Sequence, residues 1–404
     1  MLQKITAFFT ALAMLTSVQM LVPIIGEITY IRGALGVCGF YRLYDTPGEW
    51  QARRETVVGH TLDVFQIDLD KAKQVPEGKT GYAPKVAADG VSIDRFYVET
   101  IPGYYLCANL YASADPAVNT APMPLVMLAQ GHFSGDRHNS DYQYLAAAFA
   151  QRGFLVVSWD MVGRGDDNLL SHYDNYNTVI QTWNSMRLLS YLLSERFTAE
   201  STYQINTDYV AVTGASGGGT QAIYMSLLDD RLTASIPAVM VSAYSSGYCQ
   251  CENGVNALRK RNRLGVTTFK TNNAERVAAF APKPLLLISC GDDWTMRTPY
   301  DEYPYLRYVY SFYGAGSKVE NFHDLRGVHD YSLPKRQAAL DFLLRQWELP
   351  SNGVYDVPYT KDTFIPMAYD QLGTFGASSG PSRPPDASRS VLELYQRIIQ
   401  EVTA

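Results

Sequence analysis

The sequence predicts an α/β fold in which a mostly parallel central sheet is flanked by helices and entered through antiparallel strands. The first observation is an alternation, between residues 124 and 347, of short apolar runs typical of buried strands with longer amphipathic runs typical of helices. The second is a glycine-rich turn around Ser216 that joins one strand directly to a helix. A chain of 404 residues that is 47% hydrophobic can bury a core large enough for such a sheet.

The turn around Ser216 is the most informative motif. An apolar run at 209–213 is followed by Gly214-Ala-Ser-Gly-Gly218 and by a helical run at 220–228. This order is that of the nucleophile elbow of α/β-hydrolases, in which a tight, glycine-dependent turn presents the serine hydroxyl above the sheet. The motif predicts an α/β-hydrolase fold with Ser216 as the nucleophile. Glycine-rich turns before helices also bind phosphate or allow close packing, and these are the alternatives.

The first 46 residues form an apolar N-terminal segment and a linker. Lys4 precedes an uncharged run at 5–26 that is rich in Leu, Ile, Met, Phe and Ala. A secretory signal peptide and a membrane anchor both have this composition, and a buried or interfacial helix is the third interpretation. We expect export to the periplasm or cell exterior, or membrane attachment through 5–26.

The hydrolase domain is predicted to span 47–350. Before the elbow, strands are expected at 91–100, 104–112, 124–130 and 154–159. Helices are expected at 50–58, 141–151 and 178–195, and a loop at 66–90. The first two strands form a hairpin around Ile101-Pro-Gly103 and provide the antiparallel edge of the sheet.

After the elbow, strands are expected at 236–242, 284–289 and 318–322, and helices at 304–314 and 333–347. The insertion after the strand at 236–242 is long, and hydrolases build lids and substrate pockets from such insertions. Residues 351–404 are predicted to be a C-terminal extension with a linker at 373–386 and a terminal helix at 389–402.

Three residues occur in the chain order of an α/β-hydrolase triad: Ser216, Asp293 and His329. A serine hydroxyl is a weak nucleophile at neutral pH. His329 is therefore predicted to remove its proton while a carboxylate holds the imidazole in the right tautomer.

Two backbone amides are predicted to stabilise the oxyanion. The first is the amide of Gly217, which lies at a helix N-terminus where negative charge is favoured. In α/β-hydrolases the second comes from the loop after an earlier strand, here 124–130. We assign it to His132 or Phe133.

The acid of the triad has alternatives. Asp292 and Asp293 both follow the strand at 284–289, so their spacing hardly separates them. Glu252 follows the preceding strand, inside the insertion. Each of the three carboxylates could instead anchor a loop or cap a helix.

No metal or other cofactor is predicted. The five cysteines show no paired framework. Cys249 and Cys251 are interpreted as packed thiols beside a loop. A metal site is the alternative, and the lack of a second Cys/His pair near them in sequence argues against it. The loop from His132 to His138 reads H-x-x-x-D-x-H, but a loop fixes no metal geometry.

The chain resembles the bacterial α/β-hydrolases grouped with acetylxylan esterases and dienelactone hydrolases. The resemblance covers roughly Trp50 to Trp347. Its motifs are Arg95-Phe-Tyr-Val-Glu-Thr-Ile-Pro-Gly-Tyr-Tyr105, Gly131-His132, Gly214-Ala-Ser-Gly-Gly-Gly-Thr-Gln221, Cys249-Gln-Cys-Glu-Asn253, Asp293-Trp-Thr295 and the loop with Gly327 and His329.

This resemblance implies hydrolysis of carboxylic esters, of small molecules or carbohydrates, through an acyl-enzyme and without a cofactor. It aligns Asp293 with the single Asp before Trp-Thr, whereas some related esterases place a Glu after the previous strand, as at Glu252. The related glucuronoyl esterases have an elbow resembling G-C-S-R-x-G. Gly217 stands where that arginine would be, which argues against their activity.

Two other classes of function remain open: a serine peptidase of the prolyl-oligopeptidase type, and a catalytically silent binding module on the same fold. No propeller-sized region precedes the hydrolase part, and the intact set of triad residues argues against a silent module. The formal net charge of −6 gives no indication of a nucleic-acid partner. The sequence does not indicate the oligomeric state.

Overall fold

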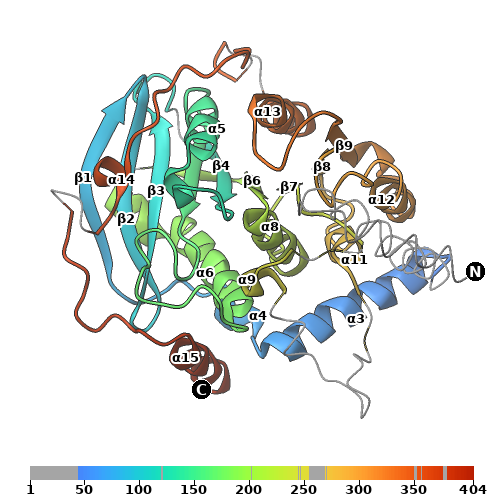
Figure 1. Ribbon diagram of the computed structural model, residues 1–404, viewed down its shortest axis with the longest axis horizontal. Coiled ribbons are helices and arrows are strands. Elements are labelled where there is room, and N and C mark those ends of the chain that lie inside the picture. Colours follow the sequence, from blue (N-terminus) through green and yellow to red (C-terminus); the bar gives the residue numbers. More distant parts are fainter. Residues whose placement is uncertain are drawn as a thin grey trace, which may run out of the picture.

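A nine-stranded mixed sheet organises the molecule (Figure 1). The computed structural model describes residues 44–119, 122–201, 203–243, 245, 247–253, 269, 271–349, 353–355, 357–375 and 380–404. The strand order is β1-β2-β3-β5-β4-β6-β7-β8-β9. The strands from β5 to β9 in this order pair in parallel, and β1, β2 and β3 form the antiparallel edge. The α/β-hydrolase architecture predicted from the sequence is confirmed.

The strands are β1 Thr80–Ala88, β2 Val91–Ile101, β3 Tyr104–Ser113, β4 Met123–Ala129, β5 Leu155–Trp159, β6 Ile205–Ala215, β7 Ala234–Ala238, β8 Leu285–Cys290 and β9 Val319–Asp324. The central strands β4, β5, β6 and β8 are buried over most or all of their length, since helices cover both faces of the sheet.

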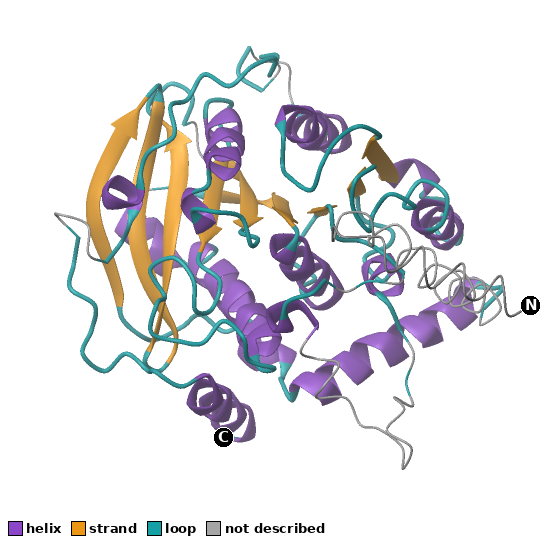
Figure 2. Cartoon of the chain, viewed as in Figure 1, coloured by secondary structure: helices purple, strands orange, loops and turns teal. Residues whose placement is uncertain are grey.

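The helices are α3 Pro47–Phe65, α4 Leu69–Ala72, α5 Ser140–Ala150, α6 Asn177–Leu192, α7 Glu195–Ser201, α8 Gly217–Leu228, α9 Gln250–Asn253, α11 Asn273–Ala278, α12 Glu302–Ser311, α13 Leu333–Trp347, α14 Tyr369–Leu372 and α15 Val391–Thr403, with short 3₁₀ helices η1 Asp136–His138 and η2 Gly316–Lys318. Helices α5 and α13 cover one face of the sheet (Figures 1 and 2). Helices α3, α6, α8 and α11 cover the other, and each face has its own apolar core.

Helix α3 is longer than the helix predicted at 50–58. It begins with a capping box, in which the Thr46 side chain accepts from the Glu49 amide and the Glu49 carboxylate accepts from the Thr46 amide. Burial of Trp50 and Phe65 against the core extends the helix to Gln66, whose left-handed backbone (φ 54°) ends it. Tertiary packing therefore lengthens a helix whose exposed face is polar.

Two boundaries predicted from the sequence are wrong. The predicted loop at 66–90 contains α4 and β1. Strand β1 is an edge strand whose pairing with β2 shifts register between Ala83 and Val86, around Pro84. Its sequence has a weak β-propensity, and pairing with β2 compensates for it. Strand β7 ends at Ala238 rather than at 242, because Val239 has a positive φ of 44°.

The C-terminal extension lies against the hydrolase domain. The Thr374 amide donates to Asp166 over 2.7 Å, and Arg336 pairs with Asp362 at 2.6 Å. The Tyr369 hydroxyl also bonds to Asp166. Contacts between distant parts of the chain therefore fix the extension.

The predicted membrane or export segment at 5–26 lies outside the described residues. Within the part of the chain that the structure describes, no helix combines the length and the hydropathy needed to cross a bilayer.

Candidate active site

The three triad candidates follow three parallel strands, two of them adjacent, at the same edge of the sheet. Ser216 directly follows β6, Asp293 follows β8 and His329 follows β9. The carboxyl ends of parallel strands lie at the same edge, which is where open α/β sheets bind their ligands. The topology therefore collects the candidates on one side of the molecule.

Ser216 has the strained backbone of a nucleophile elbow, with φ 58° and ψ −122°. The turn passes so close to β4 that a Cβ at Gly214 would lie 2.4 Å from the carbonyl oxygen of Ala129, and one at Gly218 would lie 2.1 Å from it. Glycine is therefore required on both sides of the serine. Strain of this kind persists only where the surroundings over-determine it, and functional sites are where it clusters.

Asp293 is fixed as the partner of His329. Its Oδ2 lies 2.6 Å from His329 Nδ1, and its Oδ1 accepts from the amide (2.6 Å) and the hydroxyl (2.5 Å) of Thr295. The Asp293 residue is only 4% exposed. The other imidazole nitrogen, His329 Nε2, has no hydrogen-bond partner within the described residues. The arrangement leaves Nε2 available for proton transfer while Nδ1 is held.

The loop that bears His329 is held by Lys335, a residue that the sequence reasoning missed. This buried lysine donates to the carbonyl oxygen of Val328 and to the Asp330 carboxylate, the latter over 2.5 Å. Lysine is rarely buried without partners, so these bonds account for its position. A lysine at the start of a helix gives no sequence signal for such a role.

The predicted oxyanion loop lies beside the elbow. The Tyr142 hydroxyl accepts from the Gly131 amide over 2.6 Å and donates to the Ala215 carbonyl over 3.3 Å, so it ties the loop to the elbow. The amides of His132 and Phe133 have no acceptor within the described residues. The Phe133 ring centroid lies 5.9 Å from that of His329. The loop thus borders both the elbow and the imidazole.

The two alternative acids are placed differently from Asp293. Glu252 Oε2 accepts from the amides of Tyr248 and Cys249, each over 3.1 Å. Its Oε1 lies 3.7 Å from His132 Nδ1, and burial raises the pKa of Glu252. Asp292 is exposed to solvent. Of the three carboxylates, Asp293 has the hydrogen bond to His329.

A second group of side chains lies next to the elbow. The ligand atoms of His132, His172, Cys249 and Cys251 all lie within 4.8 Å of one another. His132 Nε2 is 2.8 Å from His172 Nε2 and 3.0 Å from Cys251 Sγ. Contact with Cys251, and then with the two imidazoles, lowers the pKa of the Cys249 thiol. We refer to these four residues as the His–Cys cluster.

From the sequence alone, Cys249 and Cys251 are interpreted as packed thiols, His132 is assigned to the oxyanion loop and His172 has no role. His172 lies in the loop between β5 and α6 and carries no motif, so only the folded chain brings it to the two cysteines. A second polar group, Cys107, Asp160 and Asp166, is also compact. It surrounds Arg137, whose guanidinium pairs with both carboxylates.

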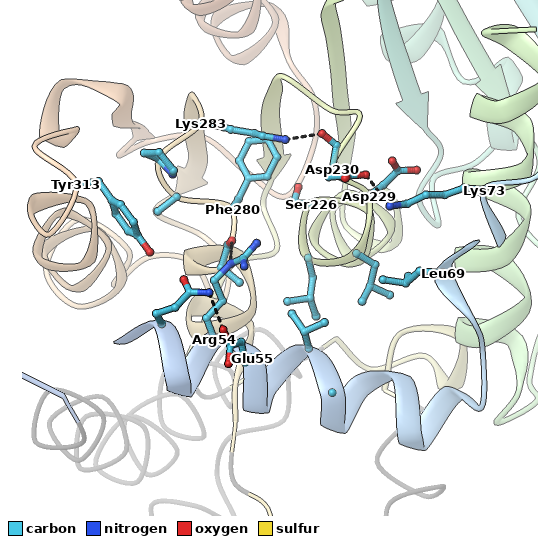
Figure 3. Close-up of a pocket in the computed structure, with 18 residues that line it drawn as sticks. Arg54, Glu55, Leu69, Lys73, Ser226, Asp229, Asp230, Phe280, Lys283 and Tyr313 are labelled. Carbon is cyan, nitrogen blue, oxygen red and sulfur yellow. Dashed lines mark hydrogen bonds and ion pairs between the residues drawn. The ribbon is translucent and has the colours of Figure 1, made fainter. Parts of the chain in front are cut away.

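A cavity of about 640 Å³ lies away from this edge of the sheet (Figure 3). Its lining includes Arg54, Leu228 and Lys283, and none of the predicted site residues. Leu228 is the last residue of α8 and Ser216 immediately precedes its first, so the cavity is roughly 18 Å from the elbow along the helix.

Comparison with known proteins gives structural relatives only. No family model matches the chain, and no curated protein matches its sequence. The solved structure of methylesterase BT1017 is similar with a TM-score of 0.77 and 28% identity, over 91% of this chain and 78% of that one.

Two more distant structures share the fold. One, from Bacteroides fragilis, is described as an acetyl xylan esterase (TM-score 0.51, 15% identity, 70% of this chain and 77% of that one). The other is a glucuronoyl esterase from Teredinibacter turnerae (TM-score 0.50, 15% identity, 75% of this chain and 86% of that one). The chain thus has the α/β-hydrolase fold of these esterases, in agreement with the resemblance seen in its sequence motifs.

Proposed function

We propose that the protein is a serine esterase that hydrolyses carboxylic esters through an acyl-enzyme, with Ser216, His329 and Asp293 as its triad. The observation that carries the proposal is the 2.6 Å contact between His329 and Asp293 on the sheet edge that carries the strained elbow. Geometry of this kind, rather than the fold, supports a reaction class.

In the proposed mechanism His329 Nε2 takes the proton of the Ser216 hydroxyl as Oγ attacks the ester carbonyl carbon. The amide of Gly217 and that of His132 or Phe133 stabilise the oxyanion. The departing alcohol takes the proton from His329. Water then attacks the acyl-enzyme, again through His329, and releases the carboxylic acid and Ser216. Hydrogen bonds between a nucleophile and its base are often long in the free enzyme, and we expect the one between Ser216 and His329 to tighten when substrate binds.

The substrate class that we propose is an ester of a carbohydrate. The name and fold of methylesterase BT1017 support an ester substrate, and the names of the two more distant esterases support a carbohydrate as its carrier. Beside His329, the Trp294 ring centroid lies 4.6 Å from the imidazole and 5.3 Å from that of Tyr248, which is 70% exposed. An exposed aromatic ring beside a catalytic base suits the apolar C–H face of a sugar ring.

The elbow disfavours the glucuronoyl-esterase pattern. A Cβ at Gly217 would lie 2.7 Å from His132 Cε1, so the arginine of that pattern has no room while His132 keeps its position. We therefore expect methyl or acetyl esters to be better substrates than glucuronoyl esters.

Active-site labelling tests the mechanism. A fluorophosphonate probe is expected to label the wild-type protein and not Ser216→Ala, with circular dichroism showing that the variant is folded. Labelling of Ser216→Ala, or a wild-type protein that is not labelled, would contradict the assignment.

A substrate panel tests the class. The panel contains p-nitrophenyl acetate, acetylated xylan, a methyl-esterified acidic polysaccharide and a proline-containing peptide. Release of acetate or methanol that depends on Ser216 supports the proposal. Cleavage of the peptide alone would favour the peptidase alternative, and the absence of both labelling and turnover would favour a silent module.

We also propose that residues 5–26 direct export or membrane attachment. Cells that express the full chain would be fractionated and the protein's N-terminus sequenced. An uncleaved protein found wholly in the cytosol would contradict this proposal.

A further inference from the structure

We propose that the His–Cys cluster is a zinc site with four protein ligands: His132 Nε2, His172 Nε2, Cys249 Sγ and Cys251 Sγ. The proposal does not depend on the esterase activity. It replaces the interpretation of Cys249 and Cys251 as packed thiols, since residues far apart in sequence complete a donor set that the cysteines alone lack.

The donor atoms are of the kind and number that zinc takes in structural sites. Two imidazole nitrogens and two sulfurs within 4.8 Å of one another match a tetrahedral site, in which Zn–N is about 2.0–2.1 Å and Zn–S about 2.3 Å. Those bond lengths place two zinc-bound nitrogens about 3.4 Å apart. The observed separation of His132 Nε2 and His172 Nε2 is 2.8 Å, so a small outward rotation of the rings would admit the ion.

The second nitrogen of His172 is bonded as in zinc sites, and that of His132 faces a carboxylate oxygen. His172 Nδ1 lies 2.6 Å from the carbonyl oxygen of Val162. A carbonyl can only accept, so Nδ1 carries the hydrogen and the neutral ring presents a lone pair at Nε2. His132 Nδ1 faces Glu252 Oε1 at 3.7 Å. Zinc-bound histidines almost always have such an oxygen partner on the other nitrogen.

Glu252 supports the cluster from a second side. Its Oε2 accepts from the amides of Tyr248 and Cys249, which holds the turn that bears both cysteines. Its Oε1 has no hydrogen bond within the described residues and is buried. This oxygen is therefore open to accept from His132 Nδ1 when the ring moves to admit the ion, and such a bond would orient His132 and raise its basicity as a ligand.

The charge balance also fits a divalent cation. Binding of Zn²⁺ displaces the two thiol protons, and two thiolates with two neutral imidazoles leave the site with no net charge, which reduces the cost of burial. In the group of Cys107, Asp160 and Asp166, the Arg137 guanidinium supplies the positive charge. The His–Cys cluster itself contains only groups that can donate an electron pair to a metal.

Four protein ligands complete the coordination of zinc, so this site is structural and leaves no open position for a substrate. Its ligands come from three segments: the oxyanion loop, the loop between β5 and α6, and the insertion with α9. The ion would join these three segments at the edge of the sheet that carries Ser216.

Metal analysis of the full chain tests the proposal. Protein purified under reducing conditions and stripped with a chelator would be titrated with Zn²⁺ against a chromophoric competitor. We expect one zinc per chain and an upward shift in Tm. Co²⁺ should give the sulfur-to-metal charge-transfer bands and intense d–d bands of a tetrahedral thiolate site.

Variants locate the ion. Cys249→Ser, Cys251→Ser and His172→Ala should each weaken zinc binding at least 100-fold. Cys107→Ala is the matched control: it removes a buried thiol outside the cluster and should keep one zinc per chain. Circular dichroism separates a lost site from a lost fold.

Several results would overturn the proposal. A wild-type protein that takes up neither Zn²⁺ nor Co²⁺ would mean that the two imidazoles share only a proton. A disulfide between Cys249 and Cys251 in the native protein would assign the cysteines to redox chemistry. Retention of the metal in the Cys249→Ser/Cys251→Ser double variant would place it elsewhere.

Discussion

Two imidazole–carboxylate pairs flank the elbow, and their geometries differ. His329 Nδ1 is 2.6 Å from Asp293, and its Nε2 has no hydrogen-bond partner within the described residues. His132 Nδ1 is 3.7 Å from Glu252, and its Nε2 contacts His172 and Cys251. The same residue types can therefore serve two roles. An imidazole whose second nitrogen is open suits proton transfer, whereas one whose second nitrogen meets other donors suits metal binding.

The surroundings of each carboxylate explain the difference. Thr295 occupies one oxygen of Asp293 and leaves the other for His329. Glu252 accepts its hydrogen bonds from the amides of its own turn, and its contact with His132 is longer than these bonds. The following predictions test this contrast, from the largest expected effect to the smallest.

Asp293→Asn should lower kcat by about 10²–10⁴, with little change in KM, because the amide can favour the wrong imidazole tautomer. Steady-state ester hydrolysis measures the effect, and Asp292→Asn, at the exposed neighbouring position, is the control. If Asp293→Asn keeps its activity while Glu252→Gln loses it, then Glu252 is the acid.

Glu252→Gln should weaken zinc binding by about 10–100-fold, as loss of a carboxylate that orients a ligand does elsewhere, while kcat falls by less than about ten-fold. Zinc competition titrations and kinetics on the same preparation separate the two effects. Unchanged zinc affinity would remove Glu252 from the support of the cluster.

Glu302 is another buried carboxylate, and its hydrogen bond is to a backbone amide and not to an imidazole. It accepts from the Ala243 amide over 2.7 Å, and burial raises its pKa to about 7. A folded-state pKa above the unfolded value stabilises the fold at low pH, and this stabilisation is lost as the pH rises through about 7.

Glu302→Gln should therefore make stability less pH-dependent, by about 1–2 kcal/mol between pH 5 and pH 8. Urea denaturation at the two pH values measures it, with the exposed Glu55→Gln as the control. If the free energy of unfolding falls equally between pH 5 and pH 8 in Glu302→Gln and in the wild type, Glu302 is not the cause of the pH dependence.

Tyr248→Ala should raise KM for a carbohydrate ester by about 3–10-fold and leave kcat nearly unchanged, since a stacking face contributes about 1 kcal/mol to binding. Tyr313→Ala removes an exposed tyrosine at the distant cavity and serves as the control. A KM for p-nitrophenyl acetate that rises equally would argue against a role in sugar binding.

The sequence predicted the parts of the fold that have strong local signals. The elbow at Ser216 and the hairpin around residues 101–103 combine glycine with regular apolar patterns, and both are present. The boundaries at 66–90 and 236–242 were wrong because edge pairing of β1 and the backbone of Val239 depend on tertiary context.

The sequence could predict only those site residues whose order along the chain is typical of a known catalytic triad. The chain order Ser, Asp, His predicted Ser216, Asp293 and His329 as a triad. In the structure Asp293 and His329 are in contact. The positions of Tyr142, His172 and Lys335 depend on how loops from different strands meet. A single sequence contains no local pattern for such contacts, so the His–Cys cluster emerges only from the fold.

The docking of the C-terminal extension has a consequence for the order of synthesis. Arg137 pairs with Asp166, and Asp166 accepts from the Thr374 amide, 208 residues later in the chain. At about 5–20 residues per second, a ribosome needs roughly 10–40 s to add that stretch. During that time the emerging chain already contains the buried charges but not the backbone that closes over them. A chain released before Thr374 would leave this carboxylate short of a hydrogen bond, so the buried charges gain their full set of partners only when the C-terminal extension has been made.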